Sequence, residues 1–309
     1  MHTILYLYKI FTKSMQKNYN IYNNLEGAMK IGIIGDSSCD FTDEIKAQID
    51  AKIAPLRVTV EDRDFIDDDS LNLEELLEAM RESKKAASSA CPSPAEFAEL
   101  MEEYDVCFVV TLSSKLSGSY NSALVAKDMV LEEHPEKKIH VVDSKSASSG
   151  QTLLALAVAE MVEEGKTFEE IAEKVEEQRK TMRTVFVLGD LDNFIKNGRL
   201  SKVAGLVANM LSIKPVLADD GQGEIIMLDK IRGTESALKR LTERVAEFSA
   251  DKDEKTVKMV LSHCNNPQRA QQVKDMILTA CPAIQQITVV NMHGLSSMYA
   301  NEGGIIVAF

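Results

Sequence analysis

The fold is decided by Lys30-Ile31-Gly32-Ile33-Ile34-Gly35-Asp36-Ser37-Ser38-Cys39-Asp40, an apolar run that ends in a polar turn. A short unbroken apolar run of this kind predicts a buried β-strand, and the turn marks the carboxyl end of that strand. The pattern recurs outward along the chain, where apolar runs at 106–111 and 139–142 alternate with stretches of helical spacing at 73–82, 95–103 and 118–133. This alternation predicts an α/β fold with a mostly parallel sheet covered by helices.

Chain length and one glycine suggest the domain organisation. The chain has 309 residues, which suits two domains of about 150 residues each. Gly165 separates two predicted helices, 149–164 and 167–183, and glycine commonly ends a helix. We therefore expect an N-terminal α/β domain over 29–165 and a C-terminal α/β domain over 166–309. We expect residues 1–28, rich in Tyr, Asn and Lys, to be an extension outside the fold, with Met29 as the true start.

Composition argues against several classes of function. The formal net charge of -13 disfavours a nucleic-acid partner, because phosphate backbones attract surfaces rich in Lys and Arg. No apolar run reaches the roughly 18 residues of a membrane span, so we expect no stable membrane insertion. The five cysteines form neither an even set nor a CxxC pair. This pattern disfavours a disulfide framework or a zinc site and favours the reducing cytoplasm.

Polar turns follow several of the predicted strands. Beyond the first turn at 36–40, they lie at 111–114, 143–146 and 262–265. Open α/β sheets bind ligands beyond the carboxyl ends of their strands. Convergence of these turns on one cleft would indicate a ligand site, whereas each turn taken alone is an ordinary cap or Asx turn.

Two stretches are rich in serine, Ser88-Ser89-Ala90-Cys91-Pro92-Ser93-Pro94 and Thr111-Leu112-Ser113-Ser114-Lys115-Leu116-Ser117-Gly118-Ser119-Tyr120. Hydroxyls and free N–H groups at a helix start can hydrogen-bond an oxyanion, and neither stretch has an adjacent catalytic base. Serine is also the ordinary choice at a helix N-cap. The residues alone therefore leave capping as the commoner explanation and anion binding as the second.

An enzymatic alternative rests on Asp36, Asp40 and Asp143, which follow strands and could serve a metal-dependent phosphatase or hydrolase. His263 is the one histidine at a plausible strand end, and the G-x-S-x-G elbow of a serine hydrolase is missing from its surroundings. We interpret His263 as a surface or structural residue. Neither GxGxxG after the first strand nor GxxxxGK[ST] occurs, which disfavours a nucleotide site.

The motifs, taken in order, resemble those of the DegV family, bacterial fatty-acid-binding proteins, over nearly the whole stretch from Met29 to Phe309. The first turn, at 36–41, resembles the family's DSTxDL, 89–97 resembles TSQPSPxxF, and 113–120 resembles SSxLSGTY. Further along, Lys196-Asn197-Gly198-Arg199-Leu200-Ser201 resembles KGGRIS. One short motif could arise by chance, whereas an ordered series makes the resemblance specific.

The resemblance implies two α/β domains with a long-chain fatty acid in a tunnel between them. It implies a carrier with no catalytic residue, no metal and no cofactor, whose ligand is presented to a separate ATP-dependent fatty acid kinase that makes acyl phosphate for phospholipid synthesis. By position, Ser89 matches the carboxylate-binding residue, and Ser117 lies in its partner loop with Ser114 nearby. Arg199 matches an arginine linked to partner docking or to head-group electrostatics.

The chain departs from the family near its C-terminus. The family has a HTGPG-like turn there whose His joins the carboxylate network, and the best match in this chain is Tyr299-Ala300-Asn301-Glu302-Gly303-Gly304. The resemblance therefore implies Tyr299 as the third member of the network, donating through its phenol. We expect Ser89 and Ser117 to act both as helix caps and as carboxylate donors.

Overall fold

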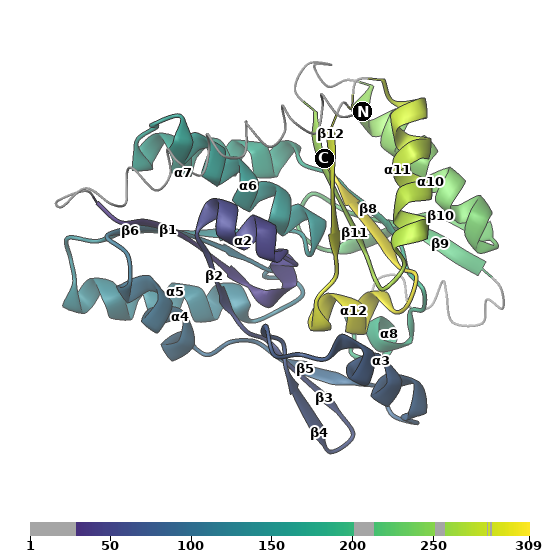
Figure 1. Cartoon of the computed structure of the whole chain (residues 1–309), viewed down its shortest axis with the longest axis horizontal. Helices are drawn as coiled ribbons and strands as arrows, with labels where there is room; N and C mark the ends of the chain where they lie inside the picture. Colours follow the sequence, from purple (N-terminus) through teal and green to yellow (C-terminus); the bar gives the residue numbers. More distant parts are fainter. Residues whose placement is uncertain (1–28, 201–212, 251–256, 283, 285) are drawn as a thin grey trace.

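The computed structural model describes residues 29–200, 213–250, 257–282, 284 and 286–309 (Figure 1). Their strands form one sheet of four strands, one of six and one of three. The two larger sheets carry long helices, and the small sheet lies below them at the bottom of the view (Figure 1). The predicted extension, residues 1–28, lies outside the described residues.

The four-stranded sheet contains the first apolar run of the chain. Its strands are, in spatial order, β2 (Ala51–Ala54), β1 (Ile31–Asp36), β6 (Val106–Thr111) and β7 (Lys138–Asp143), and every neighbouring pair is parallel. Five helices cover this sheet: α2 (Asp43–Ile49), α4 (Pro94–Glu102), α5 (Ser119–Glu133), α6 (Ser149–Glu163) and α7 (Phe168–Thr181). Consecutive strand residues point to opposite faces, so Ile33 packs with α2, α6 and α7, whereas Ile34 packs with α4 and α5. The prediction of a helix-covered parallel sheet is confirmed here.

The six-stranded sheet is mostly antiparallel, unlike the first one. Its strands are, in spatial order, β10 (Ile225–Arg232), β9 (Ile213–Asp219), β8 (Thr184–Val187), β13 (Ile305–Ala308), β11 (Lys258–His263) and β12 (Gln286–Asn291). Strands β9 and β10 form a hairpin whose turn has positive φ at Gly221 and Gly223, which glycine adopts freely. The last strand, β13, runs antiparallel to both β8 and β11, and only β11 and β12 pair in parallel within the described sheet. Helices α10 (Thr234–Ser249) and α11 (Pro267–Ala280) cover one of its faces.

The small sheet is antiparallel, in the order β4 (Arg63–Ile66), β3 (Arg57–Val60) and β5 (Ser88–Ala90). Near it lie the helices α3 (Leu73–Glu82), α8 (Asp192–Lys196) and α12 (Gly294–Ala300), and α12 contacts the 3-10 helix η1 (Ser37–Cys39). Strand β5 lies within the serine-rich stretch 88–94, for which the sequence predicted no strand. A run of only three small residues, two of them serines, has too little alternation to indicate a strand, and pairing with β3 decides its conformation.

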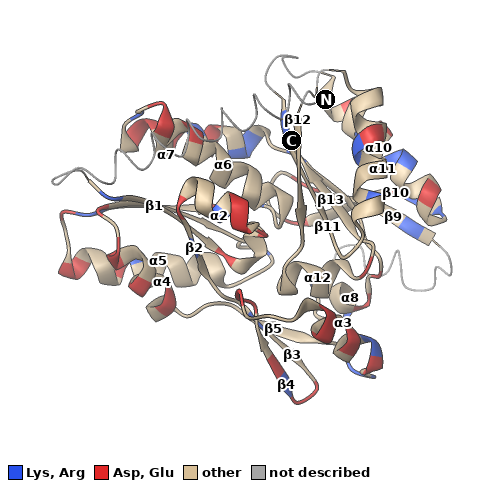
Figure 2. Ribbon diagram, viewed as in Figure 1, with Lys and Arg blue, Asp and Glu red and all other residues tan. Residues whose placement is uncertain are grey.

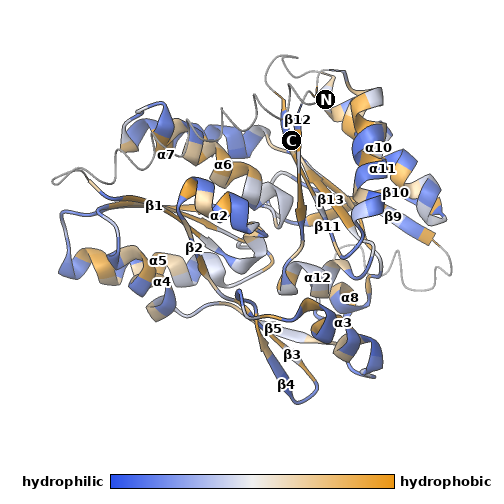
Figure 3. Cartoon of the chain, in the orientation of Figure 1, coloured by the Kyte–Doolittle hydropathy of each residue, from blue (hydrophilic) through white to orange (hydrophobic). Residues whose placement is uncertain are grey.

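Hydropathy and charge follow these layers. The strands of both large sheets are mainly apolar, whereas the helices on their outer faces alternate between apolar and polar residues (Figure 3). Acidic residues gather on outer helices such as α3, α4 and α7, and α12 carries no charged residue (Figure 2).

Helix α6 joins the two large sheets, because it packs against β1 and β6 on one side and against β11 and β13 on the other. Helix α7, which follows the predicted boundary at residue 165, also packs in the core of the four-stranded sheet through Ile171 and Val175. The division into domains at 29–165 and 166–309 stays a prediction.

Candidate functional site

A cavity of about 260 Å³ lies where the small sheet, the loop after β6 and helix α12 meet. It is lined by Leu56, Ser89, Ala90, Cys91, Leu112, Leu116, Ser117, Gly118, Arg199, Leu295 and Tyr299. These residues come from both halves of the chain, so the cavity forms only when the fold is complete. We call it the head-group cavity.

Ser89 lies in the middle of β5, paired with Val58 of β3. Its side chain is partly buried, and its hydroxyl has no hydrogen-bond partner within the described part of the chain. The prediction that Ser89 caps a helix is wrong. Ser93 caps α4 instead, in a capping box with Glu96, so the Ser89 hydroxyl is left to face the cavity.

Ser117 lies in a tight loop between β6 and α5. The loop is closed by N–H groups of Leu116 and Ser117, which both donate to the carbonyl of Ser113 at 2.9 and 3.0 Å. The N-cap position of α5 belongs to Gly118, so Ser117 does not occupy the predicted cap. Its Oγ accepts the N–H of Ser119 at 3.2 Å. Its Oγ also lies 3.2 Å from Ser119 Oγ, so Ser117 can donate to a ligand oxygen when Ser119 is the donor of that pair.

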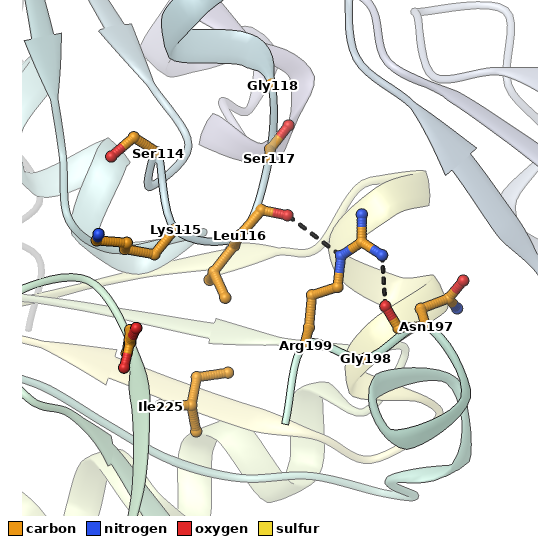
Figure 4. A pocket seen from close by; sticks show the side chains of 10 residues that line it. Ser114, Lys115, Leu116, Ser117, Gly118, Asn197, Gly198, Arg199 and Ile225 are labelled. Carbon is orange, nitrogen blue, oxygen red and sulfur yellow. Dashed lines mark hydrogen bonds between the residues drawn. The ribbon is translucent and has the colours of Figure 1, made fainter. Parts of the chain in front are cut away.

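Ser114 lies outside the head-group cavity. It lines a neighbouring polar cavity of about 310 Å³, shown in Figure 4, together with Lys115, Leu116, Ser117, Gly118, Asn197, Gly198, Arg199, Glu224 and Ile225. Its hydroxyl accepts a hydrogen bond from Lys145 Nζ at 3.2 Å, and its N–H donates to Asp143 Oδ1 at 3.0 Å. The two cavities adjoin, since Leu116, Ser117, Gly118 and Arg199 line both of them.

Arg199 stands between the two cavities. Its Nε donates to the carbonyl of Leu116 at 3.3 Å, and its Nη1 donates to the carbonyl of Asn197 (Figure 4). The side chain is exposed. The guanidinium thus links the second half of the chain to the serine loop of the first half, at the edge of the head-group cavity.

Tyr299 reaches the head-group cavity from α12. Its ring packs against Phe194 of α8, with ring centroids 4.5 Å apart and planes inclined by 44°. Four of the five predicted ligand-binding residues therefore line one cavity: Ser89, Ser117, Arg199 and Tyr299. Helix α12 itself escaped the sequence analysis, because its Gly294 and its serine pair weaken the helical signal.

The walls of the head-group cavity are apolar. Leu56, Leu112 and Leu295 belong to one hydrophobic cluster, which also contains Val58, Val60, Leu76, Ala79, Ala87 and Met298. These wall residues carried no recognisable motif in the sequence. Only the fold, which brings β3, α3 and α12 together, identifies them.

The three aspartates of the enzymatic alternative are held apart by separate partners. Asp36 accepts the N–H of Leu112 at 2.7 Å and the amide of Gln151 at 2.9 Å. Asp40 accepts the hydroxyl of Ser148 and, at 2.8 Å, the N–H of His293. Burial raises the pKa of both Asp36 and Asp40, that of Asp36 to about 6.

Asp143 is engaged differently, in an ion pair with Lys145 at 2.6 Å. Burial alone would raise the pKa of Asp143, but hydrogen bonds from Lys145 and Ser114 lower it below its usual value. Among the described residues, no group of three or more His, Cys, Asp or Glu side chains is arranged to hold a metal ion. The phosphatase alternative therefore has no support, because its acids serve as acceptors inside the fold.

His263 has a structural role, as the sequence suggested. Its side chain is buried, its Nδ1 accepts the N–H of Asn266 at 3.3 Å, and burial lowers the pKa of its imidazole. Within the part of the chain that the structure describes, no helix is both long and apolar enough to cross a membrane.

The protein has two α/β lobes, one built on each of the large sheets, and helix α6 packs against both sheets. A cavity with hydroxyl groups and apolar walls lies between elements of the two lobes. These features define the class of protein. The chain belongs to the DegV family, whose model matches residues 30–309. The resemblance seen in the sequence motifs is thereby confirmed.

Similar proteins extend this result. A DegV family protein from Ruminococcus gnavus, solved with vaccenic acid, is 40% identical, with a TM-score of 0.86, and the match covers 91% of this chain and 100% of that one. The Fatty Acid Kinase (Fak) B3 protein of Streptococcus pneumoniae, loaded with linoleic acid, is 34% identical, with a TM-score of 0.82 and coverage of 91% and 99%. A DegV domain-containing protein of Streptococcus gordonii is 36% identical over 279 residues, which are 90% of this chain and 98% of the relative.

Proposed function

We propose that this protein binds one long-chain fatty acid and presents it to a separate fatty acid kinase. The observation that carries the proposal is the head-group cavity, in which the hydroxyls of Ser89, Ser117 and Tyr299 meet leucine walls that lead into an apolar cluster. A carboxylate taken out of water needs charge-assisted hydrogen bonds, and hydroxyl donors supply them. Related structures contain vaccenic and linoleic acids, which supports the same ligand class here.

The acyl chain would supply most of the affinity. At about 0.8 kcal/mol per buried methylene, a chain of some fifteen methylenes has a gross transfer free energy of about 12 kcal/mol. Part of this is lost in ordering the chain and the side chains around it. The carboxylate donors then set the orientation of the acid, with its head group beside the exposed Arg199.

We propose further that the protein is a carrier without catalytic activity of its own. Its buried aspartates are engaged inside the fold, and the cavity hydroxyls have no adjacent general base among the described residues. The kinase would bind ATP and supply the catalytic groups for acyl phosphate formation. Such a carrier works in the cytoplasm, where its five free cysteines stay reduced.

Lipid analysis tests the proposal directly. Protein purified from a bacterial host is extracted with organic solvent, the extract is analysed by mass spectrometry, and delipidated protein is titrated with oleate. We expect a stoichiometric fatty acid in the extract and saturable binding in the titration. No extracted acid together with no oleate binding would disprove the function.

The kinase step is tested separately with a fatty acid kinase and ATP. We expect acyl phosphate only when kinase and loaded protein are mixed, and none from the loaded protein with ATP alone. Acyl phosphate formed by the protein alone would contradict the carrier role.

A further inference from the structure

Two asparagines of the second half of the chain hold the strand that carries Ser89. Asn193 Oδ1 accepts the N–H of Ala87 at 3.2 Å, and Asn197 Nδ2 donates to the carbonyl of the same residue at 2.8 Å. Ala87 lies two residues before Ser89, just outside the register that pairs β5 with β3. The two side-chain amides thus take both backbone hydrogen bonds of Ala87, as a neighbouring strand would.

The position of β5 explains why this contact matters. In the small sheet β5 is an edge strand with β3 as its one strand neighbour, and its register covers only Ser88, Ser89 and Ala90. So short an edge strand has little pairing of its own to fix its place. Ala87 is 3% exposed, so the asparagines also satisfy polar groups that water does not reach.

Asn193 makes a second contact, to α12. Its Nδ2 donates to the carbonyl of Met298 at 2.8 Å, and Met298 immediately precedes Tyr299. A side-chain amide can donate and accept at once, so one residue joins the strand of Ser89 to the helix of Tyr299. The ring of Phe194, next to Asn193 in the chain, packs on Tyr299 at the same place.

The segment that contains the two asparagines also contacts the loop of Ser117, the third hydroxyl donor of the cavity. Asn193 and Asn197 are four positions apart, which places them on one side of a helical turn. Two residues beyond Asn197, Arg199 donates to the carbonyl of Leu116, which immediately precedes Ser117. Residues 193–199 therefore contact all three segments that carry the hydroxyls of the head-group cavity.

We propose that Asn193, assisted by Asn197, is the positioning residue that holds Ser89 and Tyr299 at the spacing that a carboxylate requires. This inference rests on the proposed function, because it concerns how the same cavity selects an acid head group. Neither asparagine lines the head-group cavity, so Asn193 acts through Ala87 and Met298.

The test compares two ligands with the same tail. Delipidated wild type and the Asn193→Ala variant are titrated with oleate and with oleyl alcohol. Misplaced donors weaken the hydrogen bonds to a charged carboxylate, so we expect the variant to bind oleate at least about tenfold more weakly. We expect oleyl alcohol, which shares the tail, to change by less than about twofold, so that the preference for acid over alcohol falls about tenfold.

Two further variants separate positioning from a general loss of structure. Asn197→Ala removes the bond to the carbonyl of Ala87 and leaves both side-chain bonds of Asn193 in place, and we expect a smaller change in the same preference. Asn266→Ala is the matched control, because Asn266 caps α11 through a 3.0 Å bond to the N–H of Arg269 and does not line the cavity. It should leave the preference for acid unchanged.

A double variant gives the decisive comparison. If Asn193 acts by placing Ser89 and Tyr299, then Asn193→Ala combined with Ser89→Ala should weaken oleate binding by clearly less than the sum of the two single effects, because the part that acts through Ser89 is already lost. Equal weakening of acid and alcohol, an unchanged preference in Asn193→Ala, or fully additive effects would overturn the positioning role while leaving the fatty acid function intact. Wild type that binds neither ligand would instead overturn the proposed function, and this inference with it.

Discussion

Two groups of serines in this molecule have opposite uses. One is the head-group cavity, with Ser89 and Ser117. The other is a buried network formed by Asp40, Ser148, Ser149 and Ser262, which we call the serine network. In the network every hydroxyl has a protein partner, for example Ser149 Oγ, which donates to the carbonyl of Ile306 at 2.8 Å and accepts the N–H of Ser262 at 3.0 Å. In the cavity the Ser89 hydroxyl has none among the described residues.

The difference shows what makes a serine-rich turn a ligand site. The serine network satisfies itself across the two large sheets, because Ser148 contacts Asp40 on one side and Ser262 on the other. It therefore fixes the lobes to each other. In the cavity, by contrast, the Ser89 hydroxyl meets no protein partner among the described residues and lies beside an apolar wall, so its hydrogen-bonding capacity remains for a ligand, whereas the Ser117 hydroxyl is bonded to Ser119.

The largest expected effect comes from breaking the serine network. Ser149→Ala removes the bonds between its hydroxyl and the N–H of Ser262, the carbonyl of Ile306 and Ser262 Oγ in a region that is buried. We expect a loss of about 3 kcal/mol in the free energy of unfolding, since each of the three hydrogen bonds contributes about 1 kcal/mol. Urea denaturation followed by circular dichroism measures it.

The affinity of the same variant for oleate is the control. At a temperature and urea concentration where the protein is folded, Ser149→Ala should bind oleate as wild type does, because Ser149 does not line the head-group cavity. Unchanged stability, or a stability loss matched by an equal loss of affinity, would erase the distinction between the two groups of serines.

The next effect comes from the cavity hydroxyls. Ser89→Ala and Ser117→Ala each remove one donor to the carboxylate, and a hydrogen bond to a charged group contributes roughly 2 kcal/mol, or about thirtyfold in Kd. Titration of delipidated protein with oleate measures the loss. We expect the unfolding free energy of Ser89→Ala to stay within about 0.5 kcal/mol of wild type.

Ser114→Ala provides the matched control, since it deletes the same hydroxyl in the neighbouring cavity, where Ser114 accepts from Lys145. It should change oleate affinity much less than Ser89→Ala. If all three variants bind oleate like wild type, the carboxylate lies elsewhere and the cavity serines have only a packing role.

The sequence allowed the fold to be predicted well where local patterns decide it. Helix α3 and strand β6 lie where periodicity placed them, because their apolar spacing is set by the sheet faces that they cover. The six-stranded sheet was harder, because the direction of β13 depends on pairing with strands far away in the chain. Non-local pairing leaves no trace in a local window.

The candidate site shows the same difference between features that local sequence indicates and features that depend on tertiary contacts. Ordered motifs indicated Ser89, Ser117, Arg199 and Tyr299, and the structure brings these four to one cavity. The motifs did not indicate that Ser89 belongs to a strand, that Gly118 takes the cap position, or that Asn193 ties β5 to α12. The last of these contacts joins residues 105 positions apart, and the pairing of β5 with β3 is also outside a local window, so only tertiary structure reveals them.

A smaller effect concerns the dependence of stability on pH. Burial raises the pKa of Asp36 from its ordinary 3.8 to about 6 in the folded protein. Between these values the folded state binds a proton that the unfolded state releases, so stability rises as pH falls, by about 1 kcal/mol from pH 7 to pH 5. Asp36→Asn should remove this increment, because an amide does not titrate in this range. Gln151 can keep its hydrogen bond by turning its amide and accepting from the new Asn through its Oε1, which lacks a partner among the described residues.

Urea denaturation at pH 7, 6 and 5, at constant ionic strength, measures the slope. Burial also raises the pKa of Asp40, so we expect Asp36→Asn to flatten the dependence and not to reverse it. Ser89→Ala should keep the slope of wild type, since its hydroxyl does not contact these acids. Parallel slopes for wild type and Asp36→Asn would contradict a buried proton at this position.

The smallest effect tests Tyr299, which belongs to the cavity by position and to the packing of α8 by its ring. Tyr299→Phe keeps the contact with Phe194, whose centroid lies 4.5 Å away, and deletes only the phenol. We expect oleate to bind about fivefold more weakly, equivalent to ~1 kcal/mol for one hydrogen bond, with oleyl alcohol much less affected. Equal affinities for oleate in Tyr299→Phe and wild type would make Tyr299 a wall residue like Leu295, and the carboxylate would then be held by the two serines alone.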